Sequence, residues 1–377
     1  MTIDAGSESV EAQSIQEARP QAGPARRALY IALGLVAGMA LLILIGELVP
    51  GTAGSIARGM AREAISPQTA AVAIAVIGLN VHFGFTGLLN IGQAGFMLIG
   101  AYGLTISLKA DVPIVLAVLI GLAASVIFSL ILGLPTLRLR GDYLAIVTIS
   151  AAEIIRYVGR SSLLTDFTGA AQGIQGKSYR DPFTDLSFFG SGEKSFFFLD
   201  YQMTGVNGWW VRFVAWSLVA LCVGLIFLLA RSPWGRLLRG IREDEAAILS
   251  LGKNAFSVKM QALVIGGALG ALGGMVYVLP SSVQPDSMGR ALTFFAWTAL
   301  LLGGAATIFG PVLGSILFFM TRIFIKGTAG AIMPPEVMSS QQTEQFSWIV
   351  VGVALMLLVI FRPQGILGDK RELRFNV

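Results

Sequence analysis

The amino-acid sequence predicts an all-α protein that crosses a membrane about ten times. Hydrophobic residues make up 55% of the 377 positions, and charged residues make up only 13%. The mean hydropathy is +0.74. Several apolar stretches reach the roughly 20 residues that a helix needs to cross the hydrocarbon core of a bilayer. This composition argues against a water-soluble fold.

Ten apolar segments account for the predicted spans, and the second, third, eighth and ninth of them are short or interrupted. The expected spans are 28–49, 68–89, 91–108, 112–134, 142–160, 209–230, 259–280, 291–306, 310–326 and 346–361. Outside this transmembrane domain of residues 28–362, the polar segments 1–27 and 363–377 are expected to be cytoplasmic tails, the first of them disordered. The apolar run 29–49 is too long for the h-region of a signal peptide.

The orientation follows from the loop cations, because lysine and arginine concentrate in short cytoplasmic loops. An N-terminus inside the cell places most of these cations inside, including those of the loop 231–258, and leaves the long polar loop 163–208 outside. Both termini are therefore expected in the cytoplasm. The same loops explain the net charge of +5 without a nucleic-acid partner. The cytoplasmic cations would be Arg19, Arg26, Arg27, Arg138, Arg140, Arg231, Arg236, Arg239, Arg242, Lys253, Lys259, Arg362, Lys370, Arg371 and Arg374.

The segment 78–96, GLNVHFGFTGLLNIGQAGF, combines amides with many glycines. Glycine weakens a helix interior by about 1 kcal/mol relative to alanine. Irregular backbone at membrane depth persists only against protein or water. We therefore predict a bent stretch that lines a solute pathway; the alternative is that its glycines serve only close helix contacts. The predicted pathway residues are Asn80, His82, Gly84, Thr86, Gly87, Asn90, Gly92 and Gln93.

A second interrupted segment, LLGGAATIFGPVLGS, predicts a hinge between two half-helices at Gly303, Gly304, Gly310 and Pro311. Paired interruptions of this kind point to the central site of a transporter. A different pattern occurs in the span 259–280, where Gly266, Gly270 and Gly274 repeat every four residues. This spacing predicts close packing against another helix.

The loop RSPWGRLLRGIREDEAAILSLGKN contains an amphipathic pattern that predicts one short helix over 235–251, ended by Gly252. Such a helix can lie on lipid headgroups. Its mixed acidic and basic face is better suited to a protein partner.

Together these blocks resemble the permease subunits of branched-chain amino-acid ABC transporters of the LivM type. The resemblance extends over about residues 65–368 and rests on six blocks in the same order. These blocks are GLNVHFGFTGLLNIGQAGF with GAYG (78–103), GLPTLRLRGDYLAIVTISAAEIIR (133–156), RSPWGRLLRGIREDEAAILSLGKN (231–254), QPDS (284–287), GGAATIFGPVLG (303–314) and FRPQGILG (361–368).

The resemblance implies an ABC importer permease fold that forms half of a translocation pathway in a bacterial inner membrane. It implies a second permease subunit of the LivH type, two cytoplasmic ATPases, an external solute-binding protein, and neutral amino acids such as leucine as cargo. It also implies a coupling helix that docks on an ATPase. Two departures from the family pattern are Gln93, where many relatives carry histidine, and GGAATIFG, where many carry GGLGSLWG. The coupling residues would be Arg242, Glu243, Asp244, Glu245, Ala246, Ala247 and Gly252.

Catalytic chemistry is not expected, since His82 is the only histidine and Cys222 the only cysteine. As an ionisable residue at membrane depth His82 is a functional candidate, but a neutral, hydrogen-bonded structural role is favoured for it. The stretch AAQGIQGKS resembles a phosphate-binding loop, but Ala171 replaces its first glycine and the stretch lies in the outer loop. We therefore predict no catalytic residues, no metal site, no cofactor and no nucleotide site, with ATP hydrolysis carried out by partner subunits.

The sequence is also compatible with two other transport functions. Urea or short-chain amides are the nearest rival cargo, because urea permeases resemble the same family. An ion-coupled secondary transporter would also explain the broken helices, but it would not explain the loop 231–258, and it predicts acidic residues deep in the membrane. A membrane enzyme is disfavoured because the chain has no catalytic cluster.

Overall fold

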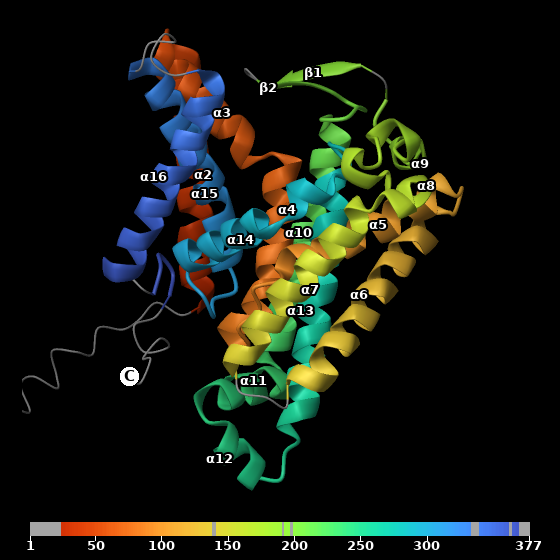
Figure 1. Ribbon diagram of the computed structural model, residues 1–377. Helices are drawn as coiled ribbons and strands as arrows, with labels where there is room; N and C mark the ends of the chain where they lie inside the picture. Colours follow the sequence, from red (N-terminus) through yellow and green to blue (C-terminus); the bar gives the residue numbers. More distant parts are fainter. Residues whose placement is uncertain are drawn as a thin grey trace, which may run out of the picture.

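The structure is a computed structural model that describes residues 24–137, 141–190, 192–196, 199–332, 339–361 and 364–368. Helices dominate this part of the chain (Figure 1). The long helices are α2 (Pro24–Leu48), α3 (Thr52–Ala64), α4 (Pro67–Leu79), which continues as the π-helix η1 (Asn80–Phe85), α5 (Gln93–Lys109), α6 (Ile114–Thr136), α7 (Gly141–Arg160), α10 (Trp209–Arg231), α11 (Pro233–Glu243), α13 (Ala255–Val278), α14 (Arg290–Gly303), α15 (Gly310–Ile332) and α16 (Ser340–Phe361).

Short elements complete the described fold. They are η2 (Ser162–Leu164), α8 (Thr165–Thr168), η3 (Ala170–Gln172), η4 (Gly176–Ser178), α9 (Asp181–Asp185), β1 (Glu193–Phe196), β2 (Leu199–Gln202), α12 (Glu245–Ser250) and η5 (Pro285–Met288). The two strands form an antiparallel hairpin in which Glu193 is opposite Gln202.

All ten expected spans coincide with helices, and the protein is a helical multi-pass membrane protein. Among the described residues, five helices are long and apolar enough to cross a bilayer: Pro67–Phe85, Ile114–Thr136, Trp209–Arg231, Ala255–Val278 and Gly310–Ile332. The count of ten crossings stays a prediction. Two spans end earlier than expected, because Gly87 (φ 77°) and Gly304 (φ 108°) take backbone conformations that end a helix.

Helix α3 was not expected, since it is too polar to be recognised as a span. It places a small residue on its inner face at nearly every turn, and Gly54, Ala57, Ala61 and Ala64 are buried. Small side chains let helices approach closely. As a result, α3 packs between α2 and α15.

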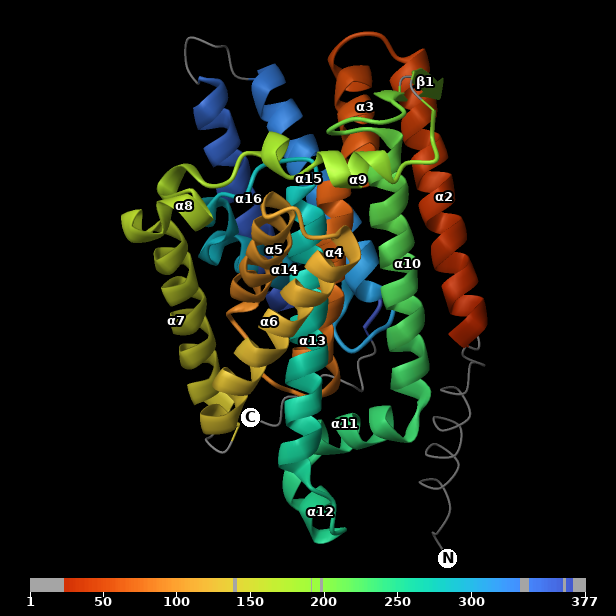
Figure 2. The ribbon, with the colours of Figure 1, turned by 90° about the vertical axis from the view of Figure 1, so that its right-hand side faces the viewer.

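The centre of the molecule is α13, which packs on α4, α5 and α6 (Figures 1 and 2). Helix α4 is apolar on every side and almost completely buried, as expected for a helix enclosed by others. A Cβ at Gly266 would collide with His82, one at Gly270 with Gln93, and one at Gly274 with the Met97 carbonyl. The predicted close packing of this glycine ladder is therefore confirmed.

The loop 163–208 is held against the end of α13. The Tyr179 hydroxyl lies 2.7 Å from the Val278 carbonyl and 3.0 Å from that of Ser281. Burial raises the pKa of Tyr179 to about 12, so the phenol stays protonated as a donor. The backbone of Ile174 pairs with that of Val283. The residues that imitate a phosphate-binding loop form the short turns η3 and η4 on either side of Ile174.

The loop 231–258 contains two helices, so the expectation of one helix over 235–251 is wrong. Asp244 interrupts it with an extended backbone (φ −153°, ψ 102°), and its carboxylate accepts a hydrogen bond of 3.1 Å from the Ala247 amide. The aspartate thus ends α11 and caps α12. Gly252 (φ 71°) follows the end of α12, as predicted.

Helices α11 and α12 lie at one end of the bundle, the end at which α2 begins (Figure 2). Residues 24–27, which were expected in the disordered tail, belong to α2. The remainder of that predicted tail, and residues 363 and 369–377 of the other, lie outside the described residues.

Candidate translocation and coupling site

The predicted pathway residues His82, Asn90 and Gln93 form one buried network in which no side chain is exposed. The Asn90 amide nitrogen lies 3.0 Å from His82 Nδ1 and 3.0 Å from Gln93 Oε1. Asn90 Oδ1 accepts a hydrogen bond of 2.8 Å from the Gly92 amide, which fixes the orientation of the side-chain amide.

This geometry assigns the tautomer of His82. An amide nitrogen only donates, so Nδ1 must accept, and the proton must reside on Nε2. His82 Nε2 lies 3.1 Å from the Leu263 carbonyl, which only accepts. Each ring nitrogen of the neutral imidazole therefore has a hydrogen-bond partner.

Gln93 joins three helices, because its amide nitrogen donates to the carbonyls of Ala75 in α4 (3.0 Å) and Gly266 in α13 (3.3 Å). Thr86 donates to the Val81 carbonyl over 2.8 Å. Buried polar networks that are fully paired give a rigid, specific arrangement. The network holds the non-helical stretch before α5 against α4 and α13.

Three residues missed by the sequence analysis complete this region. Thr148 of α7 accepts from the Ile91 amide and Thr293 of α14 accepts from the Ala94 amide, each over 3.0 Å. The Trp297 indole donates to the Asn90 carbonyl over 3.0 Å. The two hydroxyls satisfy amides at the start of α5, where a buried helix end needs partners. Isolated threonines in apolar helices carry no spacing signal that would have identified them.

Asn80 connects η1 to the second interrupted segment. Its amide nitrogen donates to the Thr307 carbonyl (2.7 Å), and its oxygen accepts from the Ala306 amide (2.8 Å). Residues 304–309 are not helical and separate α14 from α15, so the predicted interruption is present. A turn over 364–368 also contacts this segment, through the Ile366 amide and the Leu302 carbonyl at 3.0 Å.

The glycines of both segments lie where another part of the chain comes too close to leave room for a side chain. A Cβ at Gly84 would collide with Asn80 Oδ1 and the Ala306 amide, and one at Gly92 with the Thr148 carbonyl. A Cβ at Gly303 would collide with the Gly310 carbonyl. Gly310 and Pro311 begin α15, where proline is tolerated because its missing amide proton has no helical acceptor.

The predicted coupling segment also contacts η1. The Arg242 guanidinium donates to the Gly84 carbonyl in η1. A Cβ on Gly87 would lie only 3.0 Å from Cγ of Arg242. Single π-helical turns inside α-helices occur frequently at functional sites. The structure thus brings Arg242 of the predicted coupling segment and residues 306–307 of the second interrupted segment into contact with η1.

A cavity of about 380 Å³ lies beside this contact. Thr86, Gly87, Arg242, Glu245 and Lys259 contribute to its wall, and Lys259 forms a 2.5 Å ion pair with Glu245. The other predicted coupling residues are on the surface: Glu243, Ala246, Ala247 and Gly252 are exposed.

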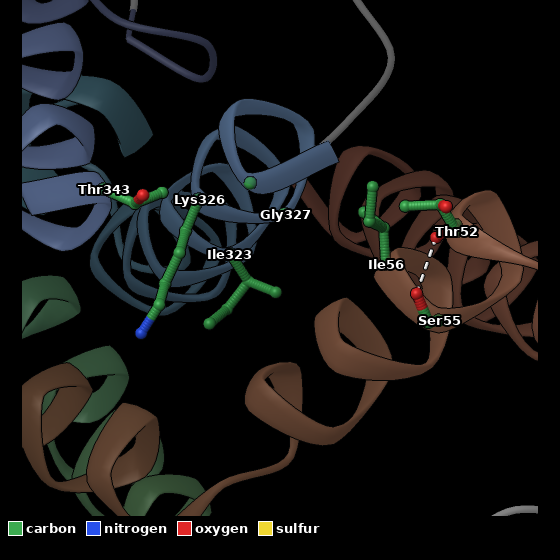
Figure 3. Close-up of a pocket in the computed structure, with 8 residues that line it drawn as sticks. Thr52, Ser55, Ile56, Ile323, Lys326, Gly327 and Thr343 are labelled. Carbon is green, nitrogen blue, oxygen red and sulfur yellow. Dashed lines mark hydrogen bonds between the residues drawn. The ribbon is translucent and has the colours of Figure 1, made fainter. Parts of the chain in front are cut away.

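A separate cavity of about 340 Å³ lies between α3 and the helices α15 and α16 (Figure 3). Ser55 donates to the Thr52 carbonyl on one wall. On the other wall, Lys326 is paired with Glu344 over 3.1 Å and directs its ammonium group away from α3. Within the described ranges, no three histidine, cysteine, aspartate or glutamate residues are grouped to hold a metal ion.

A helical membrane bundle with interrupted helices around a buried polar centre is typical of multi-pass transport proteins. The family model for the permease component of branched-chain amino-acid transport systems matches residues 62–360. The chain belongs to this family, and the predicted resemblance is confirmed. It is a non-catalytic permease component.

The chain is also similar to three individual relatives and to one solved structure. The LivM permease of Salmonella typhimurium is 31% identical over 320 residues, covering 81% of this chain and 70% of that one. A probable LivM permease of Methanocaldococcus jannaschii is 25% identical, covering 79% and 90%. A guanosine ABC transporter permease of Bacillus subtilis is 27% identical, covering 62% and 76%. A solved metal-chelate type ABC transporter in an inward-facing conformation has a TM-score of 0.47 and 13% identity, covering 88% and 99%.

Proposed function

We propose that this chain is a membrane subunit of an ATP-driven importer for branched-chain amino acids. It forms half of the translocation pathway, and a related permease subunit of the LivH type forms the other half. The observation that carries this proposal is the contact between Arg242 of α11 and the Gly84 carbonyl of η1. A pathway driven by separate ATPases requires such a connection between a surface helix and an interrupted membrane helix.

In this proposal, α11 and α12 dock on one of two cytoplasmic ATPases, and both chain termini are cytoplasmic in a bacterial inner membrane. Two features of α12 and its C-terminal turn support a protein partner there. Leu249 and Leu251 are 53% and 71% exposed, and Glu243, Asp244 and Glu245, a few residues earlier in the chain, are exposed as well. Exposed apolar side chains close in the chain to charged ones are consistent with a docking surface. The loop 163–208 at the other end offers a surface to an external solute-binding protein.

The role of the predicted pathway and hinge residues stays part of the proposal. In this conformation Asn80, His82, Asn90 and Gln93 direct their polar atoms at protein partners. A solute therefore reaches these groups only after α4, η1 or α13 moves. The absence of fixed charge among them is consistent with neutral zwitterionic cargo.

The test is transport by the reconstituted complex. The chain is co-expressed with its neighbouring permease and ATPase subunits, placed in proteoliposomes and supplied with solute-binding protein. We expect ATP-dependent uptake of labelled leucine that exceeds uptake of urea and of guanosine. Urea uptake above leucine uptake would establish the amide cargo instead. Uptake by the isolated chain on an ion gradient, without ATP, would overturn the importer proposal.

A further inference from the structure

Arg212 is a buried cation near the end of the bundle opposite to α11 and α12. It belongs to the first turn of α10, and only 6% of it is exposed. Its Nη1 donates to the carbonyls of Asn207 and Gly208, whereas Nε is buried and makes no hydrogen bond. The guanidinium carbon lies 3.4 Å from the centre of the Tyr201 ring.

No acidic side chain of the described ranges forms an ion pair with Arg212. A buried charge without a counter-ion is unfavourable by several kcal/mol. Carbonyl dipoles and an aromatic face compensate only part of that cost. The local structure therefore favours an anion beside Arg212.

Arg212 contributes to the wall of a cavity of about 630 Å³. Arg212 and Lys194 are the charged residues of its wall, and both are cations. The other lining residues are predominantly aromatic or aliphatic: Ile65, Phe189, Met203, Trp209, Phe213 and Trp216. The β1–β2 hairpin lies over this end of α10 (Figure 2), and the Trp209 indole donates to the Lys194 carbonyl over 3.0 Å. Tryptophans mark the membrane–water interface.

A second cavity of about 350 Å³ shares Ile65 and Trp216 with the first. It lies between α2 and α15, and no charged residue lines it. Its wall consists of Gly34, Gly38, Met39, Leu42, Ala64, Ile65, Trp216, Ile316, Leu317 and Met320. The pair of cavities therefore has a cationic end at the interface and a long apolar continuation along α2.

We propose that these two cavities bind an anionic glycerophospholipid. Its phosphate pairs with Arg212 and Lys194, and one acyl chain passes Trp216 and occupies the apolar space beside α2. A guanidinium suits phosphate because it presents several donors in one plane. Inorganic phosphate would use only the cationic end, and a free amino acid is too small to reach both. The bound lipid would fill the space between α2 and α15. This inference is independent of the proposed cargo.

The experiment is native mass spectrometry of the full transporter complex with added palmitoyl-oleoyl phosphatidylglycerol or the matching phosphatidylcholine. We expect phosphatidylglycerol to bind about tenfold more tightly, a difference of about 1.4 kcal/mol. Arg212→Gln should abolish this preference. Arg231→Gln is the matched control, because Arg231 is an exposed cation at the other end of α10 and stacks on Phe227 at 4.0 Å.

A second variant tests the apolar part without touching the cations. A Cβ at Gly38 would meet no atom within 4 Å, so Gly38→Leu projects into open space and should exclude the acyl chain. Binding of both lipids should fall at least tenfold. Gly224→Leu is the control, since Gly224 of α10 is equally open and lies outside both cavities.

Three outcomes would overturn the proposal. The wild-type complex binding both lipids equally would remove the anion preference, whether or not Arg212→Gln folds. Unchanged phosphatidylglycerol binding in Gly38→Leu would remove the acyl-chain site. Displacement of the lipid by millimolar inorganic phosphate or leucine alone would identify a small-anion or amino-acid site instead.

Discussion

Asn90 shows how one amide can organise a membrane-embedded loop. Its side chain contacts His82, Gln93 and the Gly92 amide, and its own carbonyl accepts from Trp297. Each of these partners is a polar atom that the bilayer would otherwise leave unpaired. The residue therefore contributes to the fold as well as to any pathway.

Replacing Asn90 with leucine should destabilise the protein. The change leaves His82 Nδ1, Gln93 Oε1 and the Gly92 amide without their partner, and each unpaired buried group costs about 1–3 kcal/mol. We expect a lower unfolding temperature of the purified complex together with reduced uptake. Thr328→Val, which removes an exposed hydroxyl of α15, is the control. Wild-type stability in Asn90→Leu would mean that the network does not hold the loop.

Arg242 is the residue at which the predicted coupling segment contacts η1. Arg242→Ala should leave ATPase binding intact but reduce uptake per ATP hydrolysed by about tenfold, a typical size for coupling between sites. The measurement is leucine uptake and ATP hydrolysis in the same proteoliposomes. Arg239→Ala is the matched control, because Arg239 belongs to the same helix but donates to the Ala230 carbonyl. Equal coupling in the two variants would contradict the assigned role.

At the scale of elements, the contact between α4 and α13 determines the core. Its closeness depends on glycine, since any side chain at Gly266 would meet His82 and the Gly78 carbonyl. Overpacking of a dense interior typically costs about 1–3 kcal/mol. Because the backbones of α4 and α13 lie against each other here, a helix would have to move to make room for a side chain.

Gly266→Ala should therefore lower stability by about 1–3 kcal/mol or prevent assembly, even though alanine favours helix. The measurement is the yield and unfolding temperature of the complex. Gly224→Ala is the control, because a Cβ there meets nothing within 4 Å and should be neutral or slightly stabilising. Equal behaviour of the two variants would show that α4 and α13 adjust freely.

Helix α12 depends on its cap, because a helix of six residues has little stability of its own. Asp244→Ala removes the acceptor for the Ala247 amide and should cost about 1 kcal/mol. We expect weaker binding of the ATPase subunits, measured by titration against the permease complex. Asp244→Asn retains the cap and should restore binding. A loss in both variants would instead point to the charge of Asp244.

At the scale of the whole molecule, the arrangement places α11 and α12 at one end and the loop 163–208 at the other (Figure 2). The proposed orientation assigns the first end to the cytoplasm. The two ends are joined through α10 and through α13, of which α13 is the more enclosed.

Cysteine labelling checks this orientation. The natural Cys222 is buried and should not react. A membrane-impermeant maleimide applied to intact cells should label Asp185→Cys in α9 but not Ser250→Cys in α12; both positions are exposed. Permeabilised cells that express the chain without its ATPase subunits provide the control, where both should react. The reverse pattern in intact cells would invert the proposed topology.

Much of the fold follows from local pattern. The ten apolar segments, the glycine ladder and both interruptions could be predicted, because hydropathy and glycine spacing are properties of neighbouring residues. Helix α3 was missed because its composition is amphipathic rather than apolar. The break at Asp244 was missed because the same aspartate is compatible with a helix surface or a helix cap.

The sequence by itself determined the membrane class, the family and the position of the interrupted segments. Only the tertiary structure decided what the polar side chains of these segments contact. Asn80 is hydrogen-bonded to Thr307, which lies 227 positions away in the sequence, and His82 to Leu263, which lies 181 positions away. No local spacing encodes such pairs. The reason is physical: in a medium without water every buried donor must find a protein acceptor, and the packing of distant helices decides which acceptor is within reach.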